Sequence, residues 1–300
     1  MTMATIRKKL VGTKEYYYLQ HTVRTPKGVE TKEKYLGTQI PANIEKLKRG
    51  FLAQIYKERW YPVLEKIRAS YSKERLTMPK SAFEKQIRSF SVKFTYDTNR
   101  IEGSKLTYRE TADLLERGLT PRAKPLDDIK EAEAHEKVFY EVLECEKELS
   151  LQLVLHWHKK LFEGTKADIA GKVREHQVAI SGSRFMPPSP VEVQPMLREF
   201  FRWYNRNKTT LHPVELAASV HLKFVTIHPF ADGNGRISRL LMNFVLQKHG
   251  FPLLNIPYVN RAGYYSALER AQLKKNSSIF VQWFFKKYVK EQKVHAGDRL

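Results

Sequence analysis

The chain has 300 residues, of which 42% are hydrophobic, so it can bury a sizeable core. Its 53 lysines and arginines outnumber its 32 aspartates and glutamates, which gives a formal net charge of +21. This charge is compatible with a polyanionic ligand or partner but does not identify one. No run of 18 apolar residues occurs, no apolar stretch follows the basic N-terminus, and Cys145 is the single cysteine. The sequence therefore predicts no membrane span, no secretory signal and no internal disulfide, and we expect a cytoplasmic protein.

Residues 1–50 predict a small basic element that contains β-strands. Runs of β-prone residues lie at 10–11, 16–19, 21–23 and 35–36, and Thr25-Pro26-Lys27-Gly28 is a turn signal between them. We expect a twisted hairpin or a three-stranded ribbon. The element has 11 basic residues against 4 glutamates. A basic ribbon with interleaved tyrosines can contact nucleic acid, but a surface ribbon with solvated lysines is the interpretation that the sequence favours.

Helical periodicity follows, first in residues 51–78, which we interpret as a helical linker. It is clear again from Phe83 to Phe94, and this helix runs into the segment Thr98-Asn99-Arg100-Ile101-Glu102-Gly103. Thr98 and Glu102 are four residues apart and so lie on one helix face, and Gly103 is a typical helix terminator. A capping box at 107–110 opens a short helix, and two more helices are predicted at 126–148 and 150–164.

Residues 171–190 predict a β-hairpin. Residues 177–180 and 184–186 are short β-prone arms around Ser181-Gly182-Ser183. Helices are then predicted at 191–205 and 213–227, and the second of these leads directly into the next motif.

The most concentrated chemistry of the chain lies in residues 228–239, His-Pro-Phe-Ala-Asp-Gly-Asn-Gly-Arg-Ile-Ser-Arg. Gly233 and Gly235 flank Asn234, which lets consecutive backbone amides curl toward one point and bind an anion. A helical pattern begins at the same place, so the anion nest sits at the positive end of a helix dipole.

The charged residues of this motif complete a site suited to a polyphosphate. Arg236 and Arg239 are three residues apart and share one helix face, from which both can reach a phosphate chain. Asp232 beside a polyphosphate is a natural ligand for Mg2+, which takes only one or two protein carboxylates. His228 is the residue here whose ordinary pKa suits proton abstraction near neutral pH.

This motif resembles the signature of the Fic (filamentation induced by cAMP) family, His-x-Phe-x-Asp/Glu-Gly-Asn-Gly-Arg-x-x-Arg, and matches every fixed position. The resemblance implies a helical core with a β-hairpin flap over the active site. It also implies transfer of AMP from Mg-ATP to a Ser, Thr or Tyr hydroxyl of a target protein, which can be the chain itself. The implied roles are general base for His228, metal ligand for Asp232, anion hole for Gly233, Asn234 and Gly235, and phosphate clamps for Arg236 and Arg239.

Two other segments are similar to segments of the same family. Residues 98–103 resemble its inhibitory motif, Ser/Thr-x-x-x-Glu-Gly/Asn, which implies that Glu102 pairs with Arg239 and so occupies the group that clamps the γ-phosphate. Residues 261–268 resemble its Tyr-Tyr-x-x-Leu segment, which implies that Tyr264 and Tyr265 form a wall of the adenine pocket. The family often has an asparagine further along this helix, where this chain has Gln272.

The expected architecture is mainly α, with a small N-terminal β-ribbon. A Fic catalytic domain, including the inhibitory helix, occupies residues 79–290, and a polar tail occupies residues 291–300. The expected function is a protein adenylyltransferase held back by Glu102. Three alternatives stay open: a hydrolase that removes AMP at the same site, a nucleotide-regulated DNA-binding protein, and a binding module without catalysis. A homodimer is compatible with the sequence.

Overall fold

The structure, a computed structural model, describes residues 4–25 and 28–297. The chain divides into two compact units, one of Met1–Ile67 with Gln292–Leu300 and the other of Arg68–Glu291. The division falls inside helix α2 (Tyr61–Thr77), whereas the limits inferred from sequence are residues 50 and 78. None of the helices in the described ranges combines the length and the apolar character needed to cross a lipid bilayer.

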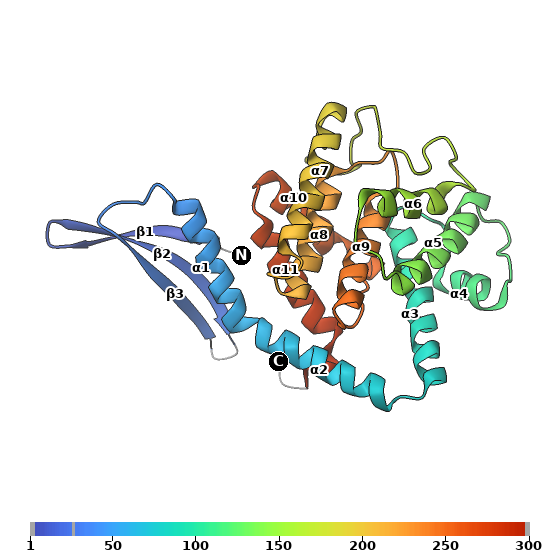
Figure 1. Ribbon diagram of the computed structural model, residues 1–300, viewed down its shortest axis with the longest axis horizontal. Helices are drawn as coiled ribbons and strands as arrows, with labels where there is room; N and C mark the ends of the chain where they lie inside the picture. The colour runs from blue at the N-terminus through green and yellow to red at the C-terminus, as the bar shows by residue number, and fades with distance from the viewer. Residues whose placement is uncertain (1–3, 26–27, 298–300) are drawn as a thin grey trace. The chain divides into compact units, whose positions relative to one another are not determined.

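The first unit is a three-stranded antiparallel sheet with a helix on one face, as Figure 1 shows. Strands β1 (Thr5–Val11), β2 (Lys14–Thr25) and β3 (Gly28–Gly37) pair in chain order, and helix α1 (Ile44–Arg59) follows them. This confirms the predicted three-stranded ribbon. Pro26 and Lys27, the centre of the predicted turn, lie outside the described residues.

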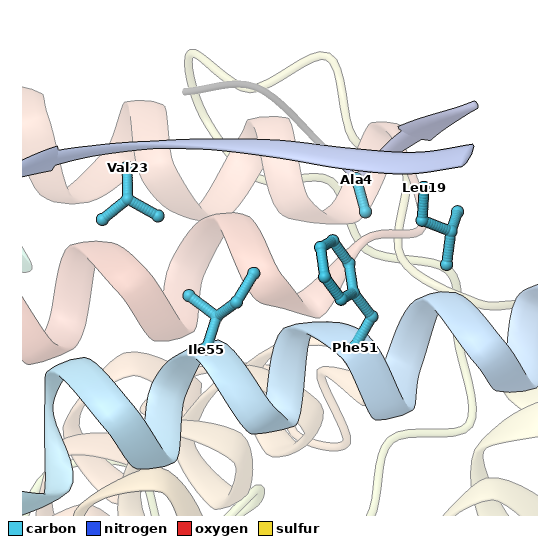
Figure 2. Close-up of a cluster of buried hydrophobic side chains, with 5 residues drawn as sticks. All are labelled: Ala4, Leu19, Val23, Phe51 and Ile55. Carbon is cyan, nitrogen blue, oxygen red and sulfur yellow. The ribbon is translucent and has the colours of Figure 1, made fainter. Parts of the chain in front are cut away.

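The core of this unit forms between the sheet and α1. Because side chains alternate along a strand, Leu19 and Val23 point to the same face of β2. Phe51 and Ile55 are four residues apart on α1 and meet them there, which buries all four side chains (Figure 2). Helix α1 therefore supplies two of the five buried residues of this cluster, the fifth being Ala4.

The second unit is helical. Its helices, after the second half of α2, are α3 (Lys80–Ile101), α4 (Tyr108–Arg117), α5 (Leu126–Glu144), α6 (Leu151–Phe162), α7 (Pro190–Asn207), α8 (Pro213–Ile227), α9 (Asn234–Lys248), the 3-10 turn η1 (Tyr258–Asn260), α10 (Arg261–Leu273) and α11 (Ser277–Glu291). A short helix α12 (Lys293–Ala296) follows in the C-terminal residues of the first unit. Helix α9 packs against α3, α5, α6 and α8 (Figure 1), which makes it the central helix of this unit.

The sequence explains why α9 is central. From Arg236 to Leu246 every side chain is buried, both the apolar ones and the polar Arg236, Ser238, Arg239 and Asn243. A helix that is buried all round needs neighbours on every face. The residue that precedes this helix, Gly233, is therefore held at a fixed place inside the unit.

The predicted hairpin at 171–190 differs from the structure. A turn is present, in which Ser183 N donates to Ile180 O at 3.1 Å, but residues 177–186 contain no strand, so the prediction of paired β arms is wrong. Polar groups of this segment form hydrogen bonds with other partners instead of pairing two strands. The amide of Arg184 donates to Glu269 Oε1 at 2.7 Å, and the side chain of Gln177 bridges the arms by donating to Pro187 O at 3.1 Å. We call residues 177–186 the flap.

Candidate active site

The signature motif forms the loop between α8 and α9. His228 caps the end of α8 in the left-handed region, with φ 52° and ψ 58°, and Gly233 precedes α9 at φ 79°. Phe230 between them is fully buried, and its ring stacks on that of His158 with centroids 3.7 Å apart. Two left-handed residues reverse the chain tightly, and the buried ring anchors the loop against the core.

Two side chains hold this loop in shape. The carboxamide of Asn234 accepts from Phe230 N at 2.9 Å and donates to Phe230 O at 2.8 Å, so only the backbone of Asn234 is available to a ligand. His158 Nδ1 accepts from Gly171 N at 2.9 Å, which places its proton on Nε2, and Nε2 donates to Asp232 O at 3.1 Å. Burial lowers the pKa of His158 to about 4, so this neutral form is stable near neutral pH.

His228 has one ring nitrogen without a proton. Its Nδ1 lies 3.2 Å from Val225 O, and because a carbonyl can only accept, Nδ1 must carry the proton and Nε2 is left with its lone pair. Burial lowers the pKa of His228, although the Glu102 and Asp232 carboxylates act in the opposite direction. The imidazole is therefore neutral at neutral pH and able to take a proton.

Arg174 ties the backbone of His228 to the ends of the flap segment. Its guanidinium donates to His228 O at 2.8 Å, to His176 O at 2.8 Å and to Pro188 O at 2.6 Å. The side chain is only 4% exposed, so these bonds are shielded from water. Arg174 therefore fixes the carbonyl of a residue whose left-handed conformation is unfavourable for a side chain with a Cβ.

Asp232 lies in a cluster of alternating charges. Its Oδ2 is 2.6 Å from Lys166 Nζ and its Oδ1 is 3.1 Å from an Arg236 guanidinium nitrogen, and both cations also contact Glu131. Burial acts to raise the pKa of Asp232, but Arg236 and Lys166 outweigh it and hold that pKa at about 2. The carboxylate is ionised, and two positive groups already occupy its oxygens.

Arg239 is fully buried and pairs with the helix that resembles the inhibitory motif. Its Nη2 lies 2.6 Å from Glu102 Oε1, its Nε donates to Thr98 Oγ1, and its Nη1 lies 3.4 Å from Tyr264 Oη. The structure thus contains the ion pair expected from the resemblance, made between residues 137 positions apart. Gly103 follows at φ 105°, a backbone conformation that favours glycine.

A cavity of about 610 Å³ brings several of these residues together. Its walls include His228, Gly235, Arg239 and Glu102, and the flap turn Ile180–Ser183 forms another side. Asp232 and Arg236 do not line this cavity, and they pair with one another at 3.1 Å.

The two tyrosines of α10 line the same cavity but differ in exposure. Tyr264 is buried, and its hydroxyl lies 3.0 Å from His221 Nε2. Tyr265 is 45% exposed and donates to Ile101 O at 3.1 Å, so its ring is the one that can contact a ligand. Gln272, at the end of this wall, donates to Thr226 Oγ1 at 3.2 Å.

Four residues around the site had no role in the sequence interpretation: Glu131, His158, Lys166 and Arg174. They contact the signature from positions 54 to 105 residues away. A buried histidine in an apolar helical stripe, or one lysine among many, gives no local signal that separates it from packing or solvation.

Known proteins are similar to this chain in both sequence and fold. Residues 148–246 match the family model of the Fic/DOC family. Protein adenylyltransferase fic-1 of Caenorhabditis elegans is 33% identical over 200 residues, which are 64% of this chain and 39% of that protein. Protein adenylyltransferase Fic of Drosophila melanogaster is 34% identical over 180 residues, 59% of this chain and 36% of that protein. The chain thus spans less than half the length of these curated relatives.

Solved structures agree with this similarity. A Fic domain-containing signaling protein from Bacteroides thetaiotaomicron superposes with a TM-score of 0.71 at 25% identity, over 78% of this chain and 95% of that one. Residues 134–508 of Fic-1 from Caenorhabditis elegans superpose with a TM-score of 0.70 at 27% identity, over 86% of this chain and 78% of that one. The mainly helical fold is therefore that of Fic domains.

Proposed function

Because the chain belongs to the Fic/DOC family, we propose that it is a protein adenylyltransferase, which transfers AMP from Mg-ATP to a Ser, Thr or Tyr hydroxyl of a protein. The observation that best supports this function is the shared cavity, where His228, Gly235 and Arg239 meet. An attacking hydroxyl requires a base, and a polyphosphate requires positive groups such as a helix N-terminus and a guanidinium. All three kinds of group surround this cavity. The names of the curated relatives favour the same reaction.

The reaction joins the hydroxyl oxygen of the target to the α-phosphorus of ATP and breaks the bond from that phosphorus to the bridging oxygen of pyrophosphate. His228 Nε2, which has a free lone pair, takes the proton of the hydroxyl. Amides at the start of α9 stabilise the negative charge that develops on the α-phosphoryl oxygens. The flap, beside the same cavity, holds the backbone of the target near His228.

Asp232 would hold the Mg2+ that accompanies ATP. It is an ionised carboxylate, and Mg2+ characteristically takes one or two such groups together with phosphates and water. No cluster of three metal-ligating side chains occurs in the part of the chain that the structure describes, which suits a metal carried in by its nucleotide. When bound, Mg2+ would neutralise phosphate charge.

Glu102 would inhibit this reaction. Its pairing with Arg239 removes a guanidinium that the phosphates of ATP require, and the Arg239 side of this pair is buried. The carboxylate also lies against Gly235, at the start of α9, where it repels a phosphate. Movement of α3, or loss of the Glu102 carboxylate, would release Arg239.

The test is incorporation of label from α-labelled ATP into protein, including the chain itself. We expect weak labelling of the wild type, stronger labelling of Glu102→Gly, and none of Glu102→Gly with His228→Ala. Labelling from γ-labelled ATP is the control for a kinase reaction and should be absent. ATP binding without label in any variant would contradict AMP transfer, and release of AMP from a pre-labelled target would then identify the hydrolase.

A cytoplasmic location accords with this function. ATP is abundant there, and a chain with the single Cys145 needs no oxidising compartment for its stability.

A further inference from the structure

The N-terminal sheet has two faces of different chemistry. Strand pairing sets Tyr16, Tyr18, Gln20 and Thr22 of β2 on the side opposite to Leu19 and Val23, which pack on α1. Their cross-strand neighbours on β1 and β3 share that side. The ten residues, which we call the open face, are Thr5, Arg7, Lys9, Tyr16, Tyr18, Gln20, Thr22, Thr31, Glu33 and Tyr35.

Each of these ten side chains can make hydrogen bonds, and the same strand pairing also places the exposed Val11 and Val29 on this side of the sheet. The open face contains threonine, glutamine and tyrosine groups together with Arg7 and Lys9, which are the side chains that proteins use to contact phosphates and base edges. A sheet face destined for solvent alone has no need of three tyrosines, and Tyr35 among them is 53% exposed. From this composition we propose that the open face binds duplex DNA.

Charge supports this partner. Glu33 is the single acidic residue of the open face, and Lys9 neutralises it through an ion pair of 2.6 Å. Residues 1–50 as a whole contain 11 lysines and arginines against 4 glutamates. A phosphate backbone approaching this element therefore meets an excess of positive charge, which provides most of the affinity of non-specific DNA binding.

Geometry favours a duplex over a single strand. Single-stranded nucleic acids bind to aromatic rings that are free for base stacking. Here Lys9 Nζ covers the ring of Tyr18 at 4.5 Å from its centroid, and the rings of Tyr18 and Tyr35 tilt against each other at 5.2 Å. The rings of Tyr18 and Tyr35 thus contact other side chains of this face and are less free to stack on a base.

Dimensions favour DNA over duplex RNA. Adjacent strands are about 4.8 Å apart, so the outer strands of this sheet are about 10 Å apart. That width compares with about 12 Å for the major groove of B-form DNA, in which other proteins place β-sheets. The corresponding groove of RNA is too narrow and deep to admit side chains.

The experiment measures binding of the full chain to a fluorescent 20-base-pair DNA duplex by anisotropy at several salt concentrations. We expect a dissociation constant in the micromolar range near 100 mM salt that weakens steeply as salt rises. The double variant Arg7→Gln, Lys9→Gln should weaken binding about tenfold. The slope of the logarithm of the affinity against the logarithm of the salt concentration should indicate one to two fewer phosphate contacts, roughly one for each cation removed.

The matched control is Lys46→Gln with Arg49→Gln, which removes the same charge from exposed positions of α1, on the other side of the sheet. This variant should retain most of the binding. Equal losses in the two variants would overturn the proposal in favour of diffuse charge attraction. Tighter binding to single-stranded DNA or to duplex RNA, or no binding to the duplex near 50 mM salt, would also overturn it. Circular dichroism melting checks that each variant is folded.

Discussion

The ammonium group of Lys166 neutralises two carboxylates of the candidate active site. Its Nζ is 2.6 Å from Asp232 Oδ2 and 3.0 Å from Glu131 Oε1. Because lysine is a compact charge on a flexible stem, Lys166 would compete with the proposed Mg2+ for Asp232. The resting site is thus electrically balanced before any nucleotide arrives.

We therefore expect Lys166→Met to strengthen metal binding. The competing cation is removed, and because Lys166 and Asp232 are each more than a third exposed, the gain should be only about two- to fivefold. Electron paramagnetic resonance of Mn2+ titrated into the protein with a non-hydrolysable ATP analogue measures this affinity. Lys160→Met, which breaks an ion pair with Glu141 instead, is the control. Weaker metal binding in Lys166→Met would show that Lys166 positions Asp232.

The pH dependence of catalysis should report the environment of His228. Burial lowers its pKa below 6.5, and a general base works when deprotonated, so the rate should rise with pH through that lowered pKa. We expect the acid limb of kcat/KM in Glu102→Gly to lie below pH 6.5. Loss of the Glu102 carboxylate acts in the same direction, since that charge raises the pKa of His228. Asp232, with a pKa of about 2, titrates far below this limb. A limb above pH 6.5 would contradict the role of His228.

The flap illustrates how one element is held without regular secondary structure. Glu269 on α10 accepts from the amide of Arg184 at 2.7 Å and lies 3.5 Å from its guanidinium. These bonds lower the pKa of Glu269, so the anchor stays charged at neutral pH. Both ends of the flap segment meet Arg174, which also holds His228 O. His228 and the flap thus share the support of Arg174.

Glu269→Ala should loosen the flap and leave the helices unchanged. We expect amide hydrogen exchange in residues 180–186 to accelerate about three- to tenfold, because a charge-assisted bond and an ion pair are lost. In Glu102→Gly, the same change should raise KM for the protein target more than KM for ATP. Glu199→Ala, which removes an exposed ion pair with Arg206, is the control and should affect neither. Unchanged exchange would show that the turn at 180–183 is stable without this anchor.

At the scale of the whole molecule, the chain has two compact units, each with its own core. Phe51 belongs to the core of the first unit, and Phe244 is fully buried in that of the second. A chain with separate cores can lose the stability of one unit while the other keeps its packing.

Phe51→Ala should therefore act locally. Truncating a buried phenylalanine costs about 3–5 kcal/mol, which is enough to open a small sheet and helix. We expect faster hydrogen exchange in residues 5–23 and unchanged exchange in residues 234–248. Phe244→Ala should do the reverse. Faster exchange in both segments of either variant would show that the two units fold as one.

The sequence by itself determined the features that depend on residues close together in the chain. The capping box at 107–110 and the helical stripes are set by the spacing of residues and by their dihedral preferences, which act over a few residues. The three-stranded ribbon and the helix that begins at Asn234 were predictable for this reason. The pairing of Glu102 with Arg239 was expected only through resemblance, since no local pattern joins residues 137 positions apart.

Only the tertiary structure decided the supports of the site and the form of the flap. Lys166 and Arg174 reach the signature from 66 and 54 residues away, through packing that no local periodicity records. The β-prone arms of the flap do not pair, because Glu269 on another helix takes the amide of Arg184 and because prolines follow the second arm. Long-range contacts with charged partners outweighed strand propensity in this segment.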